Sequence, residues 1–282
     1  MDILKSVLFG IVEGITEWLP VSSTGHMILL EEFVKFEDVS KEFFSMFEVV
    51  IQLGAILAVV LLYFKEIWPF AKEPKIPYAK TGLFAHVDKT IMILWYKILL
   101  ACVPAAIVGI ALDDLLEKYL YNSLVVGTML ILFGIAFIVV ENKNKDLKPV
   151  TLKASKITYK QALIIGLFQL IAAIFPGTSR SGATIIGALM IGVSRKAAAD
   201  FTFYLAIPVM FGASLLKIVK FGFHFTGAEA AVLLVGMIVA FAVSYVVIKM
   251  LLGYIKQHDF KVFGWYRIAL GIVVWLYFGL IG

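Results

Sequence analysis

The sequence is short of charge and of cysteine. Only 16% of its 282 residues are charged and 61% are hydrophobic, with a mean hydropathy of +0.96, whereas an average soluble domain is about 25% charged. A chain this apolar cannot shield its surface from water, so lipid must form part of its solvent. The single cysteine, Cys102, excludes an intrachain disulfide and a metal cage built from cysteines.

The net charge of +5 does not indicate a nucleic-acid partner. The lysines lie beside apolar segments and form no basic groove with interleaved aromatic side chains. An excess of positive charge on one side of a membrane accounts for them. We therefore expect membrane lipids as partners and no nucleic acid.

Six apolar stretches are long enough to cross the roughly 30 Å of hydrocarbon in a bilayer as helices. One of them contains Pro208, which a membrane helix tolerates when its neighbours satisfy the freed backbone groups. These stretches predict an all-α polytopic membrane protein, with residues 1–282 forming a single membrane domain. The stretches are 44–64, 91–112, 124–140, 201–220, 228–248 and 263–281.

Two further apolar segments are interrupted by polar turns. The first, from Ile3 to Leu30, breaks at Pro20, and the second, from Tyr159 to Val193, breaks at Pro176. No arm of either segment is long enough to span the bilayer. We predict that each segment is a re-entrant helix hairpin whose turn lies inside the membrane.

The two broken segments align with each other. At an offset of 156 the matched pairs are Gly10 with Gly166, Glu13 with Gln169, Pro20 with Pro176, and Ser23 with Ser179. Each half of the chain, residues 1–140 and 157–282, is therefore expected to be a re-entrant hairpin plus three transmembrane helices. An odd number of spans turns the second half upside down, which predicts an inverted-topology repeat with a site near the bilayer midplane.

Positive charge gathers on one side of this topology. Four loops hold 16 Lys and Arg residues, and the other side holds 6. Because cytoplasmic loops carry the excess of Lys and Arg, both termini are expected outside. The four loops are 65–89, 141–160, 193–200 and 249–261.

Glu13 and Glu17 lie four residues apart, so they share one face of the first short helix. A charge at the membrane centre costs at least about 2.5–3.5 kcal/mol on insertion scales, so these carboxylates need a cation, a metal or water. The alternative is that residues 3–19 form an amphipathic surface helix with solvated acids. Gly10 and Gly14 favour helix packing instead.

The first turn continues with Ser22, Ser23, Thr24 and His26. Hydroxyl groups and free N–H groups at the start of a helix favour an anion. The alternative is a plain helix cap with a buried, satisfied histidine.

The second turn is more specific for phosphate. Its glycines let the backbone approach a ligand, and Arg180 supplies a planar fork of donors. An arginine inside an apolar re-entrant segment is functional by default; the alternative is a structural salt bridge with Glu13 or Glu17. The turn contains Gly177, Thr178, Ser179, Arg180 and Ser181, followed by Thr184.

Two such turns, entering from opposite sides, predict one site for a molecule with two phosphates. Mg²⁺ or Ca²⁺ held by Glu13 and Glu17 would neutralise a diphosphate, since hard cations take carboxylate and phosphate oxygens. Glu48 and Gln52, four residues apart in a span, are expected to line the cavity. Arg267, near a span end, is expected to snorkel to the interface.

At these residues the sequence resembles the bacitracin-resistance type of undecaprenyl-diphosphatase. The motifs that carry the resemblance are EGITEWLPVSSTGH at 13–26, FEVVIQLG at 47–54 and PGTSRSGAT at 176–184. The first and last motifs are long and specific, and the resemblance covers nearly the whole chain. Trp18 stands where phenylalanine is expected, which is a conservative change.

The resemblance implies hydrolysis of a polyprenyl diphosphate lipid, undecaprenyl diphosphate, to undecaprenyl phosphate and phosphate, with a divalent cation. It also implies resistance to bacitracin and a plasma-membrane protein whose site faces outside. The implied catalytic residues are Glu17, Ser23, His26 and Arg180, with Glu13 in support. The expected substrate-binding residues are Ser22, Thr24, Gly177, Thr178, Ser179, Ser181 and Thr184.

The sequence leaves several alternatives open. Either Ser23 attacks phosphorus with His26 as base, or His26 activates water; we favour Ser23. A polyprenyl-phosphate flippase or secondary transporter is the main functional alternative, because broken helices are typical of transporters. A non-catalytic lipid-binding subunit is the third, and a homodimer is neither required nor excluded.

Overall fold

The computed structural model of the chain describes residues 1–37, 39–70, 86–222 and 224–280, apart from the side chains of residues 113, 114 and 117. Within these residues the chain is helical, and the strand-like pairings are two isolated bridges. Six of the described helices are long and apolar enough to cross a membrane. The prediction of an all-α polytopic membrane protein is confirmed.

The six long helices fall at the six predicted stretches. Polar residues cap the starts of several of them: the side chain of Ser40 caps α3, Asn122 caps α6, and Thr226 forms a capping box with Glu229 at α10. Each cap satisfies an N–H group that would otherwise lack a partner in the membrane. The long helices are α3 (Lys41–Leu62), α5 (Lys89–Leu120), α6 (Ser123–Asn144), α9 (Arg195–Phe221), α10 (Gly227–Tyr254) and α11 (Lys261–Leu280), and a short α4 (Phe64–Ile67) follows α3.

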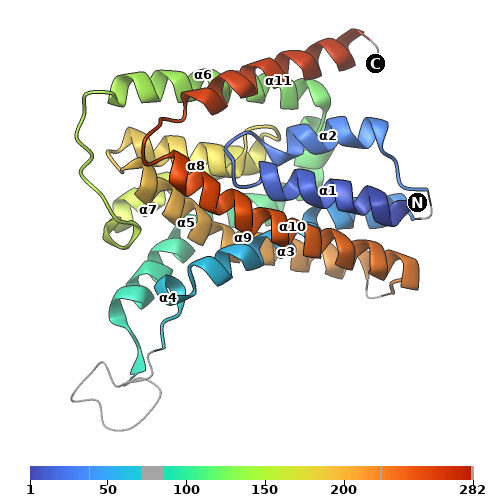
Figure 1. Cartoon of the computed structure of the whole chain (residues 1–282), viewed down its shortest axis with the longest axis horizontal. Helices are drawn as coiled ribbons and strands as arrows, with labels where there is room; N and C mark the ends of the chain where they lie inside the picture. Colours follow the sequence, from blue (N-terminus) through green and yellow to red (C-terminus); the bar gives the residue numbers. More distant parts are fainter. Residues whose placement is uncertain (38, 71–85, 223, 281–282) are drawn as a thin grey trace.

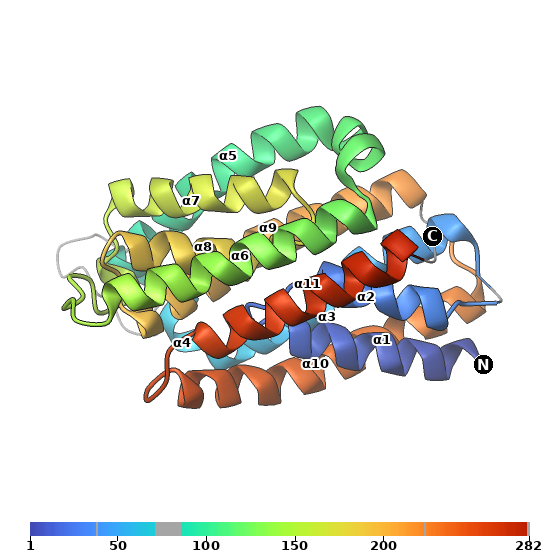
Figure 2. The same ribbon diagram turned by 90° about the horizontal axis from the view of Figure 1, so that it is seen from above.

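Each broken segment forms a pair of short helices, as predicted. The pairs are α1 (Asp2–Thr16) with α2 (Ser23–Phe33), and α7 (Tyr159–Ile174) with α8 (Arg180–Met190), the second pair preceded by the one-turn η2 (Ala154–Lys156). The 11 residues of α2 or α8 rise about 16 Å, roughly half of the hydrocarbon thickness. The two hairpins enter from opposite ends of the molecule, the first from the end that carries both termini (Figure 2).

The first arm of each hairpin packs along a span from the other half of the chain. Helix α1 lies against α10, and α7 lies against α5. A methyl group added at Gly10 would lie 2.7 Å from the carbonyl oxygen of Gly236, and one added at Gly166 would collide with the backbone of Ala101. With α3 against α9 and α10, and α6 beside α11 (Figure 1), these contacts hold both turns in the interior.

Apolar side chains fill the interior and also cover the outside. Phe201 and Phe203 in α9 are fully buried, whereas Ile107 and Ile110 in α5 are 63% and 75% exposed. An outer surface of this kind would be unfavourable in water. It suits helices that face hydrocarbon.

Candidate active site

The two turns have the same local structure. Ser22 and Ser179 are the N-caps of α2 and α8, with positive φ angles of 73° and 69°. The hydroxyl of Ser22 accepts a hydrogen bond from the N–H of Gly25, and that of Ser179 accepts one from Gly182. The structural partner of Ser179 is therefore Ser22, and the pairing of Ser179 with Ser23 is wrong. The second turn has one more residue between its proline and its cap.

Ser23 and Arg180, the first residues of α2 and α8, both bond to the carboxylate of Glu17. Ser23 Oγ donates to Oε2 at 2.9 Å, and Arg180 Nη2 donates to Oε1 at 2.8 Å. The side chains of Arg180 and Glu17 are 13% and 9% exposed, so the ion pair is shielded from water. Of the two salt bridges considered for Arg180, the one with Glu17 is formed. Three of the four predicted catalytic residues are in direct contact.

Neighbouring polar groups fix the guanidinium and the carboxylate. Arg180 Nη1 donates to the carbonyl oxygen of Thr202 in α9 at 3.0 Å, and Ser181 Oγ donates to the carbonyl oxygen of Glu17 at 3.1 Å. Thr184 Oγ1 lies 2.9 Å from the carbonyl oxygen of Arg180 and 2.9 Å from Thr202 Oγ1. Ser181 and Thr184 therefore hold the site together, and Thr202 joins them although its sequence position gave no signal.

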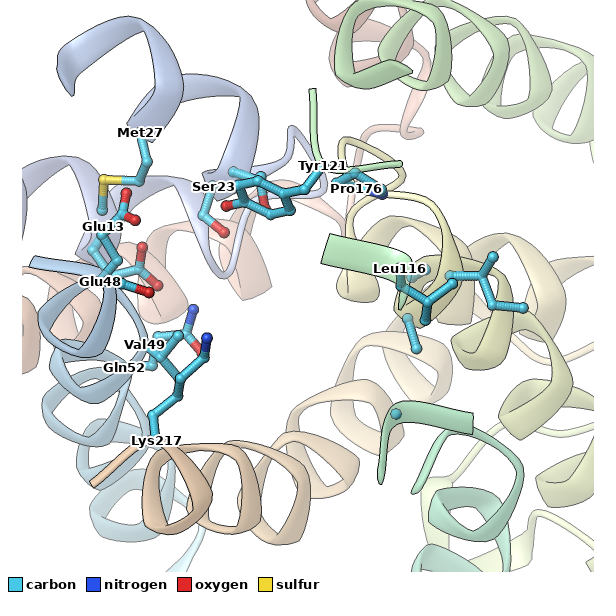
Figure 3. A pocket seen from close by; sticks show the side chains of 16 residues that line it. Glu13, Ser23, Met27, Glu48, Val49, Gln52, Leu116, Tyr121, Pro176 and Lys217 are labelled. Carbon is cyan, nitrogen blue, oxygen red and sulfur yellow. The ribbon is translucent and has the colours of Figure 1, made fainter. Parts of the chain in front are cut away.

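A cavity of about 330 Å³ lies in front of Ser23. Ser23 and Thr24 line it from the first hairpin, and Pro176 lines it from the second. Glu48 and Gln52 line it from α3, as their spacing predicted (Figure 3). The cavity is therefore bounded by both hairpins and by a long helix.

The cavity continues toward the end of the molecule that carries the termini. A second cavity shares Ser45 and Lys217 with it and is lined by the start of α3 and the end of α9. Glu17 and Arg180 are not among the lining residues. Their ion pair lies behind Ser23, away from the opening.

His26 bonds to different partners from those predicted. Its Nδ1 lies 2.7 Å from the carbonyl oxygen of Ser22, and its Nε2 lies 2.7 Å from the hydroxyl of Tyr266, whose ring stacks on the imidazole. A carbonyl oxygen only accepts, so Nδ1 carries a proton and, in the neutral ring, Nε2 accepts. Within the described residues His26 has no hydrogen bond to Ser23 or to Glu17. The carboxylate of Glu17 takes the place predicted for His26 beside the serine hydroxyl.

Arg267 joins the two turns from α11. It is 0% exposed, its Nη2 donates to the carbonyl oxygens of Gly177 and Thr178 at 2.9 and 2.8 Å, and its Nη1 donates to Pro20 at 3.3 Å. The prediction that Arg267 snorkels to the interface is wrong. Because α11 packs closely along α6, with its Gly264 against that helix, this face of α11 points inward.

The second turn thus presents part of its backbone to Arg267 instead of to the cavity. Gly177 has φ +87°, and a Cβ there would lie 2.5 Å from the carbonyl oxygen of Val126. Thr178 is 0% exposed, and its hydroxyl has no hydrogen-bond partner among the residues that the structure describes. Arg267 could have been found as a charge inside a span, whereas Tyr266 has no comparable sequence signal.

The acidic residues differ in their suitability for a cation. Both carboxylate oxygens of Glu17 accept hydrogen bonds. Glu13 is 1% exposed, and its buried Oε1 has no hydrogen-bond partner in the described part of the chain. Glu13 lines the cavity beside Glu48 (Figure 3). The described residues contain no cluster of three or more His, Cys, Asp and Glu side chains that could hold a metal. The unpartnered oxygen fits a hard cation that takes its other ligands from water and phosphate.

The fold and the site define a multi-pass membrane protein with a carboxylate, a hydroxyl and a guanidinium gathered where two hairpins meet. Residues 6–273 match the family model described as bacitracin resistance protein BacA, and the chain belongs to this family.

Several curated relatives are similar over almost their entire length. An undecaprenyl-diphosphatase of Desulfitobacterium hafniense is 58% identical over 278 residues, which cover 99% of this chain and 96% of the relative. One from Lachnoclostridium phytofermentans is 57% identical, covering 99% and 97%. The undecaprenyl-diphosphatase 1 of Clostridium acetobutylicum is also 57% identical, covering 99% and 98%.

Proposed function

We infer that this protein hydrolyses undecaprenyl diphosphate to undecaprenyl phosphate and phosphate. This reaction recycles the lipid carrier of cell-wall synthesis and confers bacitracin resistance, in agreement with the family and its relatives. The observation that carries the chemistry is the contact of Ser23 and Arg180 with the single carboxylate of Glu17. A nucleophile, an acid–base group and a guanidinium are the groups that phosphoryl transfer uses.

We propose that the diphosphate occupies the cavity in front of Ser23. The N–H groups at the start of α2 favour an anion there. The guanidinium of Arg180 lies behind Ser23, and a phosphate drawn up to Ser23 would reach it by competing with Glu17 for its donors. Thr24 lines the same wall and adds a hydroxyl donor. The polyprenyl tail would leave between helices toward the hydrocarbon, which the apolar outer surface permits.

In the proposed first step, Ser23 Oγ attacks the terminal phosphorus. The hydroxyl proton passes to Glu17 Oε2, the Oγ–P bond forms, and the bridging P–O bond breaks with its electron pair leaving on undecaprenyl phosphate. Arg180 stabilises the charge on the transferred phosphoryl group, where a preorganised donor is worth most. The 2.9 Å distance from Ser23 Oγ to Glu17 supports the carboxylate as base.

In the second step, water attacks the phosphoserine and the Oγ–P bond breaks. Ser23 regains a proton from Glu17, and the attacking water loses one to His26 Nε2 once Tyr266 releases that nitrogen. The position of His26 on α2, one turn beyond Ser23, supports a role in this step. The alternative of direct attack by water activated by His26, without a phosphoserine, is distinguished by experiment below.

We propose that Glu13 and Glu17 take part in holding Mg²⁺ or Ca²⁺, with the remaining ligands supplied by water and phosphate. The unpartnered oxygen of Glu13 supports this assignment. Each carboxylate oxygen has two lone pairs, so Glu17 can bind a cation while it accepts from Ser23. Such an ion would neutralise diphosphate charge and polarise the phosphoryl oxygens.

We also propose that residues 1–140 and 157–282 are inverted repeats. If the two halves are equivalent, α1 corresponds to α7, α3 to α9, α5 to α10 and α6 to α11. The contact of α1 with α10 then corresponds to that of α7 with α5, and the contact of α3 with α10 corresponds to that of α9 with α5. The contacts of α3 with α9 and of α6 with α11 each join a helix to its own counterpart, so they are unchanged when the halves are exchanged. The shared cap geometry of Ser22 and Ser179 gives independent support.

The protein is expected in the plasma membrane with the site open to the outside. The cavity leads toward the end with both termini, and the positive loops at the other end are expected in the cytoplasm. A homodimer stays a proposal, which the mass of the detergent-solubilised particle tests against a chain mass of 31.3 kDa.

The test of the function is phosphate release from farnesyl diphosphate by the purified chain in detergent, with chelator and with added metals. The wild type should release phosphate, and Ser23→Ala should lose at least about 10²-fold in turnover. Ser155→Ala is a matched control, because Ser155 lies away from the cavity. A wild-type chain that binds the substrate but releases no phosphate would leave a transporter or a lipid-binding protein.

A further inference from the structure

A basic cavity lies at the end of the molecule opposite the termini. It has a volume of about 580 Å³ and is formed where four helices meet: the ends of α6, α8 and α10 and the start of α9. The loop that follows α6 (Figure 2) contributes Leu147, Lys148, Pro149 and Val150 to its lining. It shares no lining residue with the cavity in front of Ser23.

Five cationic side chains and one carboxylate line this cavity. The carboxylate, Glu141, is 2% exposed and is already bound by Arg195 through Nε and Nη2, at 2.9 and 2.5 Å, and by the N–H of Phe260 at 3.0 Å. Lys196 pairs with Asp200 at 2.6 Å. Among the described residues, Glu141 is the only acid that lines the cavity, and its carboxylate is already bound to Arg195.

The other three cations have no ion pair. Among the described residues, Lys145, Lys148 and Lys256 form no salt bridge, although all three line the same space. The first turn of α9 also lines the cavity, and its dipole adds partial positive charge. Like charges held together in this way favour a bound anion.

The rim of the cavity is apolar. Leu147, Val150 and Met190 line it and are 66%, 85% and 59% exposed. The loop that carries Leu147 and Val150 is fixed to the α8–α9 connection, because the N–H of Val150 donates to the carbonyl oxygen of Gly192 at 2.8 Å. The exposed apolar side chains are therefore held beside the lysines at a fixed position.

Lysines over an apolar rim, at the ends of spanning helices, match a lipid headgroup with its chains. We propose that this cavity binds the phosphate headgroup of an anionic membrane lipid from the leaflet at this end. Basic pockets between helix ends suit such headgroups, and the acyl chains would cover Leu147, Val150 and Met190. A soluble phosphate would satisfy the lysines but would leave the apolar rim in water.

The proposal is tested by native mass spectrometry of the full chain in detergent, titrated with dioleoyl phosphatidylglycerol. The triple variant Lys145→Gln, Lys148→Gln and Lys256→Gln should weaken this binding at least about tenfold. This loss of affinity is smaller than the full contribution that three lysines make to binding at an anionic lipid surface. Its melting temperature and phosphate release should stay at wild-type values, because these exposed side chains form no hydrogen bond or ion pair with other described residues.

A matched control removes the same charge from the same end of the molecule. Lys143, Lys153 and Lys160 are exposed and do not line the cavity. Their triple replacement by Gln should change the affinity less than twofold. Equal losses in the two triple variants would show general surface attraction and overturn the site, as would an unchanged affinity of the first variant.

Two further ligands identify the source of the phosphate. Dioleoyl phosphatidylcholine should bind at least about tenfold more weakly than phosphatidylglycerol, because its headgroup carries no net charge. Glycerol 3-phosphate or inorganic phosphate at equal concentration should not displace the lipid. If either one displaces it, the site takes a soluble phosphate and the lipid assignment is wrong.

Discussion

Arg267 and Gly177 lie 90 residues apart in the chain, yet the guanidinium donates to the glycine carbonyl at 2.9 Å. The same side chain also reaches the carbonyl oxygens of Thr178 and Pro20. One buried cation thus ties both hairpin turns to α11. The turns carry Ser23 and Arg180. The relative position of these two residues therefore depends on Arg267, which among the described residues forms a hydrogen bond with neither side chain.

Replacing Arg267 by Met should lower stability and activity together. Three buried carbonyl groups would lose their donor, and each such loss costs about 1–3 kcal/mol. We expect a fall of at least about 6 °C in the melting temperature in detergent, with reduced phosphate release. Arg267→Lys should be intermediate, because an ammonium group lacks the fork of donors. Lys261→Met, in the same helix but partly exposed, serves as the control. A wild-type melting temperature for Arg267→Met would contradict the role.

Glu17, Ser23 and Arg180 should behave as one catalytic unit. Glu17→Gln, Ser23→Ala and Arg180→Ala should each reduce turnover at least about 10²-fold. The double variant of Glu17→Gln with Ser23→Ala should have the same turnover as the less active of the two single variants. The losses caused by replacing residues that act together are not additive. Steady-state rates on farnesyl diphosphate measure this. Additive losses would mean that the two side chains act independently.

His26→Ala should accumulate phosphate on Ser23. If the serine attacks first and His26 assists water in the second step, loss of the imidazole slows only the release of phosphate. Mass spectrometry of the peptide that contains Ser23, after rapid quenching, should detect the phosphorylated form. Ser23→Ala combined with His26→Ala supplies the control. Full activity of Ser23→Ala would instead favour water activated by His26.

Glu13→Gln should weaken divalent cation binding at least about tenfold, because it removes the charge of a carboxylate whose Oε1 has no hydrogen-bond partner among the described residues. Electron paramagnetic resonance of bound Mn²⁺ measures the affinity without reference to activity. Glu48→Gln should have an effect in the same direction. Glu42→Gln, an exposed acid in the same helix as Glu48, should leave the affinity unchanged. Unaltered Mn²⁺ binding by Glu13→Gln would place the cation elsewhere.

Ser179→Ala should be less stable than Ser179→Gly by about 1 kcal/mol. Both variants lose the capping hydroxyl, but only glycine adopts a positive φ without strain. Ser194 caps α9 with an ordinary φ of −66°, so the difference between its Ala and Gly variants should be smaller. Thermal unfolding in detergent compares the four variants. Equal differences at the two positions would show that the backbone at Ser179 is not strained.

The sequence alone determined the membrane class, the six spans and the two broken segments. In lipid every backbone polar group must be satisfied within the protein. A long apolar run does this by itself as a helix, so such runs leave little freedom. The proline and glycine positions fixed where the short helices end. The motif residues also indicated the chemistry, because an arginine and two acids are costly in hydrocarbon unless they have a function.

The tertiary structure decided which polar groups meet. Whether Ser23 bonds to His26 or to Glu17 depends on the direction in which α2 leaves its turn, and no spacing along the chain reports that direction. Arg267 points inward only because α11 packs closely on α6. The burial of a polar side chain and its hydrogen-bond partner depend on contacts between helices that are distant in the sequence. The local sequence pattern therefore could not predict them.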